Sequence, residues 1–399
     1  MPNHIQSLGY ALDCDTRKGG FVDITIAQRD LARLLAKAVA MTSDKPKKPI
    51  MACVILDAKN NLLLAKAADD DITMSVTTRT SCEVAKPGIV AVNAKDLYAR
   101  VQLHAAGPVR LVERAGKLEV IGIGTKRKHV LTTALVDDYP LLPEPAKSSA
   151  PIRVVSRSLA RMLSHVEYAM CDDSTRPNVN GAAVEFDGKM MHVIALDGRV
   201  MAHIGSEFAT DAPLKLLVQR QAAIQLRKII EASRTDIESS NTDIEVDGAN
   251  MFFTIAATRL SVKRMSVEFP DWRMVLSSCN HTASVDVGRA KLIDMVRSAD
   301  VAAKENFIML DFAPTLLRVW AESDTGESSD DVPVTYDGKA FPLGLTSKLI
   351  LDVLNALESD SVRLFVGSSG DPGLDPLIVR PVTDKTDEIF DGLIMPRRV

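Results

Sequence analysis

The chain has 399 residues, a formal net charge of −4 and 46% hydrophobic residues. It contains no apolar run near the roughly 18 residues of a membrane-spanning helix, so we expect no contact with a membrane. Its five cysteines are odd in number and widely spaced, which favours reduced thiols and a cytoplasmic protein over a disulfide framework. Residues 1–20 lack the apolar segment of a signal peptide, and we expect them to form a flexible extension.

From residue 21 onward, one pattern recurs six times. Two apolar β-formers one residue apart are followed, five residues later, by the first apolar position of a helix-like run. This change of hydrophobic period from 2 to 3.6 predicts a strand that leads directly into an amphipathic helix. The spacing between copies is 58 to 68 residues, and one copy has Gln at its second position. In chain order the copies are Ile24/Ile26/Leu31, Val90/Val92/Leu97, Ile152/Val154/Leu159, Leu217/Gln219/Ile224, Val285/Val287/Leu292 and Leu343/Leu345/Ile350.

Each predicted helix is followed by short alternating segments that turn dipeptides interrupt, such as Asn60-Asn61 and Asp187-Gly188. A unit of one strand, one helix and a small meander is too small to bury its own core, so we expect the units to pack in pairs. The sequence therefore predicts an α+β fold with three similar domains. Their expected ranges are 21–145, 150–280 and 282–399, with a proline-rich linker at 140–151 and a second joint at 277–282.

The charges are distributed unevenly between the predicted helices and the rest of the chain. Lys plus Arg minus Asp plus Glu is +7 over the helical segments and −11 elsewhere. Such segregation suits helices that face phosphate, although a general preference of helices for Lys and Arg is the alternative explanation. The segments counted are 29–41, 94–104, 157–167, 219–233, 288–304 and 346–358.

Helix spacing limits how such a protein could surround a duplex. Six helices side by side at about 9–10 Å form a circle only about 18 Å across, too narrow for DNA about 20 Å wide. Twelve helices give about 36 Å between axes, or about 26 Å of clear space. If the repeats form a ring around DNA, two chains are needed, joined head to tail.

Five short motifs resemble, in order, motifs of the bacterial DNA polymerase III beta subunit, the beta sliding clamp. The resemblance spans about residues 21–399. It implies the DNA clamp fold and a homodimeric ring that holds a polymerase on double-stranded DNA without reading its sequence. It also implies docking of the polymerase III alpha subunit, the clamp loader and repair proteins through short linear motifs. The motifs are Thr175-Arg176-Pro177-Asn178-Val179-Asn180-Gly181, Ile194-Ala195-Leu196-Asp197-Gly198-Arg199, Phe269-Pro270-Asp271-Trp272-Arg273, Leu351-Asp352-Val353-Leu354-Asn355-Ala356-Leu357 and Leu393-Ile394-Met395-Pro396-Arg397-Arg398-Val399.

The family is non-catalytic, and the sequence offers no alternative chemistry. It has no Gly-x-Ser-x-Gly elbow, no P-loop and no Cys-x-x-Cys pair. Asp69-Asp70-Asp71 is more typical of a solvated turn between strands than of a Mg²⁺ site, and the histidines lack ligand spacing. We therefore expect no enzyme activity, no metal and no cofactor. A paralogue that binds peptides or an inhibitor without a role in replication is the alternative function.

Basic residues in one loop and on the predicted helices are the candidates for DNA contact. In Lys45-Pro46-Lys47-Lys48-Pro49 the prolines stiffen a loop that carries three ammonium groups, which favours phosphate contact, although the loop could simply be solvated. The resemblance supports the first interpretation and adds Arg176. The full set of candidates is Lys45, Lys47, Lys48, Arg29, Arg33, Arg100, Arg157, Arg161, Arg176, Arg220 and Arg297.

The resemblance also implies a groove that receives partner peptides, whose Met and Val walls could repack around different apolar anchors. Ordinary core packing is the alternative, particularly for Val179 and Val275. The chain departs from the family pattern at Arg199-Val200-Met201 and at Arg397, so its preferred peptide is expected to differ. The matching positions are Val179, Leu196, Gly198, Arg199, Val200, Met201, Pro270, Met274, Val275, Leu393, Met395, Pro396 and Arg397.

The family's dimer interface corresponds to residues at two ends of the chain. Val301, Ala302 and Phe307 match one side, and His129 and Leu131, on an expected edge strand, match the other. Pairing of edge strands across two subunits would cover an aggregation-prone edge. Ala302 is small and His129 is polar, which predicts a weaker dimer unless other residues compensate.

Overall fold

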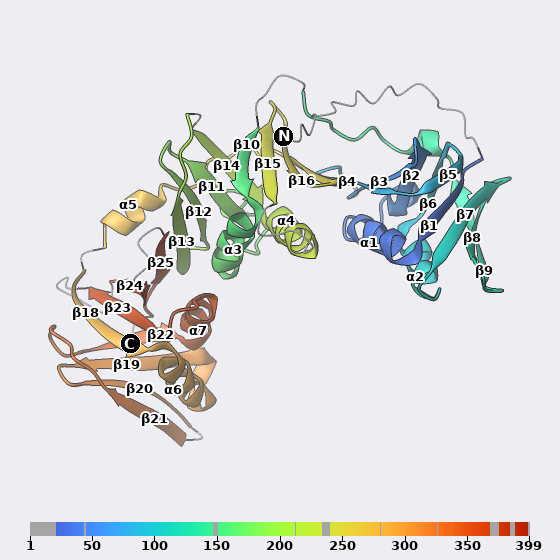
Figure 1. The fold of residues 1–399 in the computed structure, drawn as a ribbon. Helices are drawn as coiled ribbons and strands as arrows, with labels where there is room; N and C mark the ends of the chain where they lie inside the picture. The colour runs from blue at the N-terminus through green and yellow to red at the C-terminus, as the bar shows by residue number, and fades with distance from the viewer. Residues whose placement is uncertain are drawn as a thin grey trace, which may run out of the picture. The chain divides into compact units, whose positions relative to one another are not determined.

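The computed structural model describes residues 21–43, 45–146, 151–211, 213–233, 240–279, 281–324, 326–367, 375–383 and 388–397. The chain forms two compact units, which Figure 1 shows coloured along the sequence. Unit 1 consists of Met1–Ser149 and Asn250–Lys263, and unit 2 consists of Ala150–Ala249 and Arg264–Val399. The expected extension at residues 1–20 lies outside the described residues.

Two helices of unit 1, α1 (Gln28–Val39) and α2 (Ala94–Gln102), pack against each other. The apolar side chains of α1 recur every three or four residues, so Leu31 and Leu35 are buried while Arg33 is exposed. The side chain of Asn93 accepts a hydrogen bond from the Asp96 N–H and thereby caps α2. Both helices begin at the residue after a strand, as predicted.

The strands of unit 1 form an antiparallel sheet that α1 covers on one side. Its turn at Asn60 and Asn61 has positive φ at both residues, as the Asn-Asn dipeptide predicts. The strands are β1 (Asp23–Ala27), β2 (Cys53–Lys59), β3 (Leu62–Ala68), β4 (Met74–Ser81), β5 (Glu83–Lys86), β6 (Gly88–Asn93), β7 (Pro108–Arg114), β8 (Lys117–Gly122), β9 (Lys128–Ala134), β16 (Asn250–Ile255) and β17 (Thr258–Lys263), and short 3₁₀ helices lie at Pro49–Ala52 and Val136–Asp138. Their order is β16-β17-β4-β3-β2-β6-β9-β8-β7-β1-β5.

The β16–β17 hairpin of this sheet comes from a distant part of the chain. Leu260 of β17 pairs in register with Val76 of β4. The buried hydroxyls of Thr78 and Thr258 lie 2.9 Å apart, and the Lys37 ammonium donates to Thr258 at 2.7 Å. These contacts explain why the hairpin belongs to unit 1.

The helices of unit 2 also pack against one another. α3 contacts α4 and α7, and α6 contacts α7. The short α5 is not part of the repeat and was not predicted. The helices are α3 (Ser156–Val166), α4 (Arg220–Ala232), α5 (Trp272–Ser277), α6 (Arg289–Ala302) and α7 (Ser347–Ala356), with 3₁₀ helices at Glu167–Ala169 and Lys304–Asn306.

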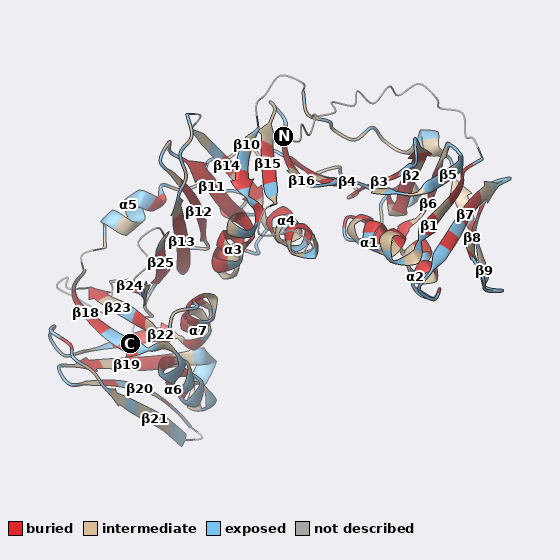
Figure 2. Ribbon diagram, in the orientation of Figure 1, coloured by how far each residue is buried: buried red, intermediate tan, exposed pale blue. Residues whose placement is uncertain are grey.

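The strands of unit 2 form two antiparallel sheets and a separate pair, β10–β15. Figure 2 shows that buried residues lie along the strands and on the helix sides that pack against them. The strands are β10 (Ile152–Val155), β11 (Gly181–Phe186), β12 (Met190–Leu196), β13 (Val200–Glu207), β14 (Leu214–Gln219), β15 (Asn241–Val246), β18 (His281–Gly288), β19 (Phe307–Ala313), β20 (Leu316–Ser323), β21 (Gly326–Pro333), β22 (Phe341–Thr346), β23 (Ser361–Gly367), β24 (Leu377–Val382) and β25 (Glu388–Ile394). The sheet orders are β14-β11-β12-β13-β25-β24-β23-β18 and β21-β20-β19-β22.

All six predicted transitions from strand to helix are confirmed. They are β1–α1, β6–α2, β10–α3, β14–α4, β18–α6 and β22–α7. None of the helices in the described part of the chain is long and apolar enough to cross a bilayer. The expected boundaries of three domains stay a prediction.

Candidate functional site

The floor of the predicted groove is buried. Val179, Val200, Met201 and Leu393 expose no more than 2% of their surface. Met201 and Leu393 are register partners on β13 and β25. They share a hydrophobic cluster with Trp272, which we call the Trp272 core and whose other members are Ala183, Ile194 and Ile378.

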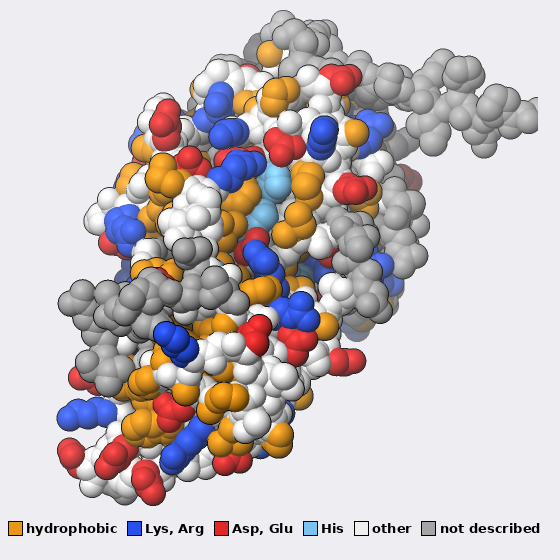
Figure 3. All heavy atoms as spheres, turned by 90° about the vertical axis from the view of Figure 1, so that its left-hand side faces the viewer, with side chains coloured by type: hydrophobic (Ala, Val, Ile, Leu, Met, Phe, Trp, Pro, Cys, Tyr) orange, Lys and Arg blue, Asp and Glu red, His pale blue; other side chains and the backbone are white. Residues whose placement is uncertain are grey.

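Other predicted groove residues are exposed. The exposed fractions are 65% for Met274, 36% for Val275 and 39% for Met395. Between the floor and the surface, Leu196 packs against the Trp272 core. Figure 3 shows hydrophobic side chains exposed among charged ones on the side of unit 2 that carries α5. The core alternative therefore holds for Val179 but not for Val275.

Local hydrogen bonds place α5 at this surface. The Asp271 carboxylate accepts the N–H groups of Arg273 and Met274, at 3.1 and 3.3 Å, and so caps the first turn. Trp272 then points into the core while Met274 and Val275 stay outside. This cap explains why Asp follows Pro in the Phe-Pro-Asp motif.

The turn between β12 and β13 is tied to the end of the chain. Gly198 has φ of +94°, which an L side chain rarely adopts, and Asp197 accepts the N–H groups of Arg199 and Val200 at 2.7 and 2.9 Å. The Arg199 carbonyl accepts from the Met395 N–H at 2.8 Å. These contacts bring the Asp-Gly turn next to the C-terminal Met-Pro segment.

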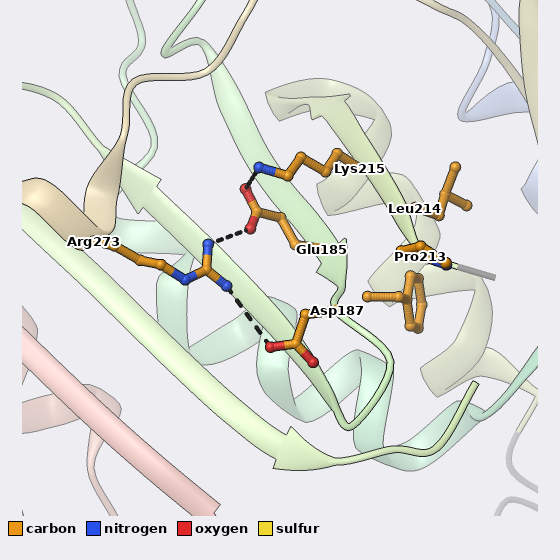
Figure 4. A pocket seen from close by; sticks show the side chains of 7 residues that line it. Glu185, Asp187, Pro213, Leu214, Lys215 and Arg273 are labelled. Carbon is orange, nitrogen blue, oxygen red and sulfur yellow. Dashed lines mark hydrogen bonds and ion pairs between the residues drawn. The ribbon is translucent and has the colours of Figure 1, made fainter. Parts of the chain in front are cut away.

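A charged pocket of about 550 Å³ lies beside α5 (Figure 4). Buried Glu185 pairs with Arg273 at 2.8 Å and with Lys215 at 3.7 Å. Arg273 also lies 3.9 Å from the Asp187 carboxylate, and its guanidinium stacks 4.2 Å above the Trp272 ring. Because these charges pair with one another, the pocket holds α5 against the sheet and offers little to a charged ligand.

Several basic residues predicted to contact DNA already have partners. The Lys47 ammonium pairs with Asp71 at 2.8 Å, and hydrogen bonding to this carboxylate raises the lysine pKa. Arg161 pairs with Glu388 and lies 3.6 Å from Glu358. The remaining pairings are Arg100 with Asp96 at 3.2 Å, Arg176 with the Asp197 carbonyl at 2.8 Å, and Arg220 with the Met170 carbonyl at 3.3 Å.

The other basic candidates are exposed. Within the described ranges, the side chains of Arg29, Arg33, Arg297, Lys45 and Lys48 form no hydrogen bond or ion pair. Arg157 is exposed as well. These residues could meet phosphate without first breaking an internal contact.

The Asp69-Asp70-Asp71 segment forms the turn between β3 and β4, as expected. Asp69 accepts the Met74 N–H at 2.9 Å, and Asp70 accepts the Lys47 N–H at 3.2 Å. A search of the described residues finds no group of three or more His, Cys, Asp or Glu side chains suited to a metal ion.

Comparison with known families identifies the group to which this fold and groove belong. The chain matches the model of the DNA polymerase III beta subunit N-terminal domain over residues 22–143 and that of its C-terminal domain over residues 278–398. The chain belongs to the beta sliding clamp family. This family supplies a non-catalytic processivity factor for DNA replication, so the chain is not an enzyme.

Relatives match over most of the chain. The beta sliding clamp of Chlamydia trachomatis is 22% identical over 99% of the chain and 92% of its own length. That of Escherichia coli K12 is 21% identical over 86% of the chain and 93% of its own length. Among solved structures, the Pseudomonas aeruginosa sliding clamp has a TM-score of 0.86 at 20% identity, and the Thermotoga maritima beta subunit has 0.85 at 19%. Each covers 95% of the chain and is itself covered completely. The expected α+β clamp fold is confirmed.

The residues that match the beta clamp dimer interface differ in exposure. Val301, at the end of α6, is 88% exposed, and Ala302 is half-buried. The Arg397 guanidinium lies 5.1 Å from the Phe307 ring, so this groove residue covers part of the predicted interface. On β9, Leu131 is buried and His129 packs edge-on against His104.

Proposed function

We propose that the chain is a DNA sliding clamp, a homodimeric cytoplasmic ring that encloses duplex DNA and tethers the replicative polymerase. The main support is a similarity that runs over 99% of the chain to a protein described as a beta sliding clamp. The six confirmed repeat helices, with the positive charge that their segments carry, agree with it. A ring keeps a polymerase near its template without specific contacts to bases.

The exposed arginines and lysines are the proposed DNA contacts. Arg29 and Arg33 on α1, Arg297 on α6 and the loop residues Lys45 and Lys48 have no internal partner to give up among the described residues. Each would contribute a small, salt-dependent interaction with phosphate. Lys47, Arg100 and Arg161 would have to exchange a carboxylate for phosphate, so we expect less from them.

The proposed partner site lies over the Trp272 core. Met274, Val275 and Met395 supply exposed apolar side chains, and Leu196 lies partly buried beside Met201 and Leu393. A short peptide with Leu or aromatic anchors could bury these groups there. We propose that the polymerase III alpha subunit and the clamp loader dock in this way.

Primer extension on a long, singly primed circular template tests the proposal. With the cognate polymerase and clamp loader, addition of the chain should lengthen the products of a single binding event. The mass in solution should correspond to two chains. A protein that binds the partner peptides yet leaves product length unchanged would instead be the scaffold paralogue.

A further inference from the structure

A line of buried ionisable side chains crosses the sheet of unit 2 beneath α5. The Asp187 carboxylate lies 3.1 Å from Nε2 of His192, and Nδ1 of His192 lies 3.0 Å from Nε2 of His203. Nδ1 of His203 lies 2.9 Å from the Asp391 carboxylate. His192, His203 and Asp391 are 6%, 3% and 3% exposed. We call these four residues the histidine relay.

Both carboxylates of the relay are held in the charged form. The other oxygen of Asp187 accepts the N–H groups of Lys189 and Met190, at 3.0 and 2.9 Å, and these bonds hold the Asp187 pKa well below its usual range. Burial alone would raise the pKa of Asp391, but hydrogen bonds from His203 and Arg380 outweigh burial and lower it. Neither carboxylate is therefore the donor in the relay.

Counting protons then fixes the charge of the two imidazoles. Each of the three contacts in the relay needs one hydrogen between its heavy atoms. Two neutral imidazoles supply only one N–H each. Since the carboxylates are anionic, the third hydrogen must lie on a ring nitrogen, and the pair carries one extra proton.

The surroundings indicate which ring carries it. Burial lowers the pKa of His192, and its neighbours His203 and Arg273 are cationic or can become so. His203 instead lies directly against Asp391. The other charges at this site are paired: Arg380 with Asp391 at 2.7 Å, and Glu185 with Arg273 at 2.8 Å and Lys215 at 3.7 Å.

We propose that His203 is a buried imidazolium at neutral pH, and that its proton joins β25 to β13 and fixes Trp272 in a pH-sensitive way. The Trp272 ring stacks on His203 with centroids 4.3 Å apart and lies 5.3 Å from His192. Trp272 is also part of the core beneath the exposed α5 residues. This inference does not rest on the proposed function.

The relay is complete at only one protonation level. Loss of the extra proton leaves two lone pairs facing each other across 3.0 Å, and uptake of another places N–H opposite N–H. Because burial lowers the pKa of His192 in the folded chain, the unfolded chain binds that further proton more readily. The junction should therefore be most stable in an intermediate range and weaken on either side, the acid side lying below the ordinary His value of about 6.5.

Long-range ¹H–¹⁵N spectra of the ¹⁵N-histidine-labelled full chain test the proposal directly. At neutral pH we expect one ring with two protonated nitrogens and one neutral ring with its proton on Nε2. His203→Gln and His192→Gln assign the signals, and His281→Gln, whose ring donates to or accepts from the Pro376 carbonyl region outside the relay, is the matched control. Two neutral rings at neutral pH would overturn the proposal, and the wild-type spectrum decides this even if a variant fails to fold.

Tryptophan emission provides a second readout. The chain has two tryptophans, so Trp320→Phe leaves Trp272 as the reporter. An imidazolium stacked on an indole quenches it, so emission should be low at neutral pH and rise when alkaline conditions remove the proton. Emission that does not change with pH while the fold is intact would contradict the assignment.

Discussion

Met201 on β13 and Leu393 on β25 are register partners, and each is only 2% exposed. Their pairing joins the middle of the chain to its last strand. It also places two predicted groove residues beneath the surface, so the groove has a buried floor and an exposed rim. Floor and rim should respond differently to substitution.

Leu393→Ala should reduce the free energy of unfolding by about 2–5 kcal/mol, because it removes buried methyl groups and leaves a cavity. Met274→Ala, on the exposed rim, should change it by less than about 0.5 kcal/mol. The rim variant should nonetheless bind a clamp-loader peptide more weakly. Urea unfolding and fluorescence anisotropy of a labelled peptide measure the two effects. Equal stability losses in both variants would contradict the division into floor and rim.

Asp71→Asn should strengthen the binding of duplex DNA, because it frees Lys47 from its ion pair. The slope of the logarithm of affinity against the logarithm of salt should steepen by up to about 0.9 for one added phosphate contact. Anisotropy of a labelled duplex across a salt series measures the slope. Asp243→Asn, which frees Arg153 from a similar exposed pair, is the control. The same steepening in both variants would show a general charge effect instead.

Arg161→Gln should lower stability more than it lowers DNA binding. The substitution deprives the Glu388 carboxylate of its guanidinium partner, at a cost of about 1–3 kcal/mol. Arg33→Gln should do the reverse, with weaker DNA binding and a stability change below about 0.5 kcal/mol. Thermal unfolding and DNA anisotropy on both variants separate the roles. A larger loss of DNA binding in Arg161→Gln would place this residue among the DNA contacts.

Acid should weaken unit 1 through the carboxylate of Asp23. Hydrogen bonds from Arg110 at 2.6 and 2.7 Å lower the Asp23 pKa in the folded chain. Such a group adds stability above its unfolded value of about 3.9, and this stability is lost as pH falls through the lower folded value. Asp23→Asn should therefore be less stable at neutral pH and lose less on acidification. Urea unfolding across pH measures this, and parallel pH profiles for the two proteins would exclude the contribution.

The local pattern of the sequence predicts the repeated elements well. Each strand-to-helix transition depends on residues within about ten positions, such as Ile24 and Leu31, and all six are confirmed. The turn residues Asn60 and Asn61 are similarly local. Periodicity indicates these elements because each must bury one face, whatever its neighbours are.

The contacts between distant segments have no local signal. Arg161 and Glu388 are 227 positions apart, and His203 and Asp391 are 188 apart. Their sequence surroundings do not distinguish a paired side chain from a free one. For this reason the sequence predicts Arg161 as a DNA contact and misses the relay, the β16–β17 hairpin on β4 and the neutralisation of Lys47. Exposure at the groove and at Val301 also depends on packing that only the fold determines.

Retention on DNA of different topology tests the central proposal most directly. The labelled chain is loaded onto nicked circular plasmid with the cognate clamp loader and ATP, then filtered at high salt before and after one restriction cut. A closed ring should stay with the circle at high salt and be lost once the DNA is linear. Equal retention on circular and linear DNA, or loss from both, would contradict a ring that encloses the duplex.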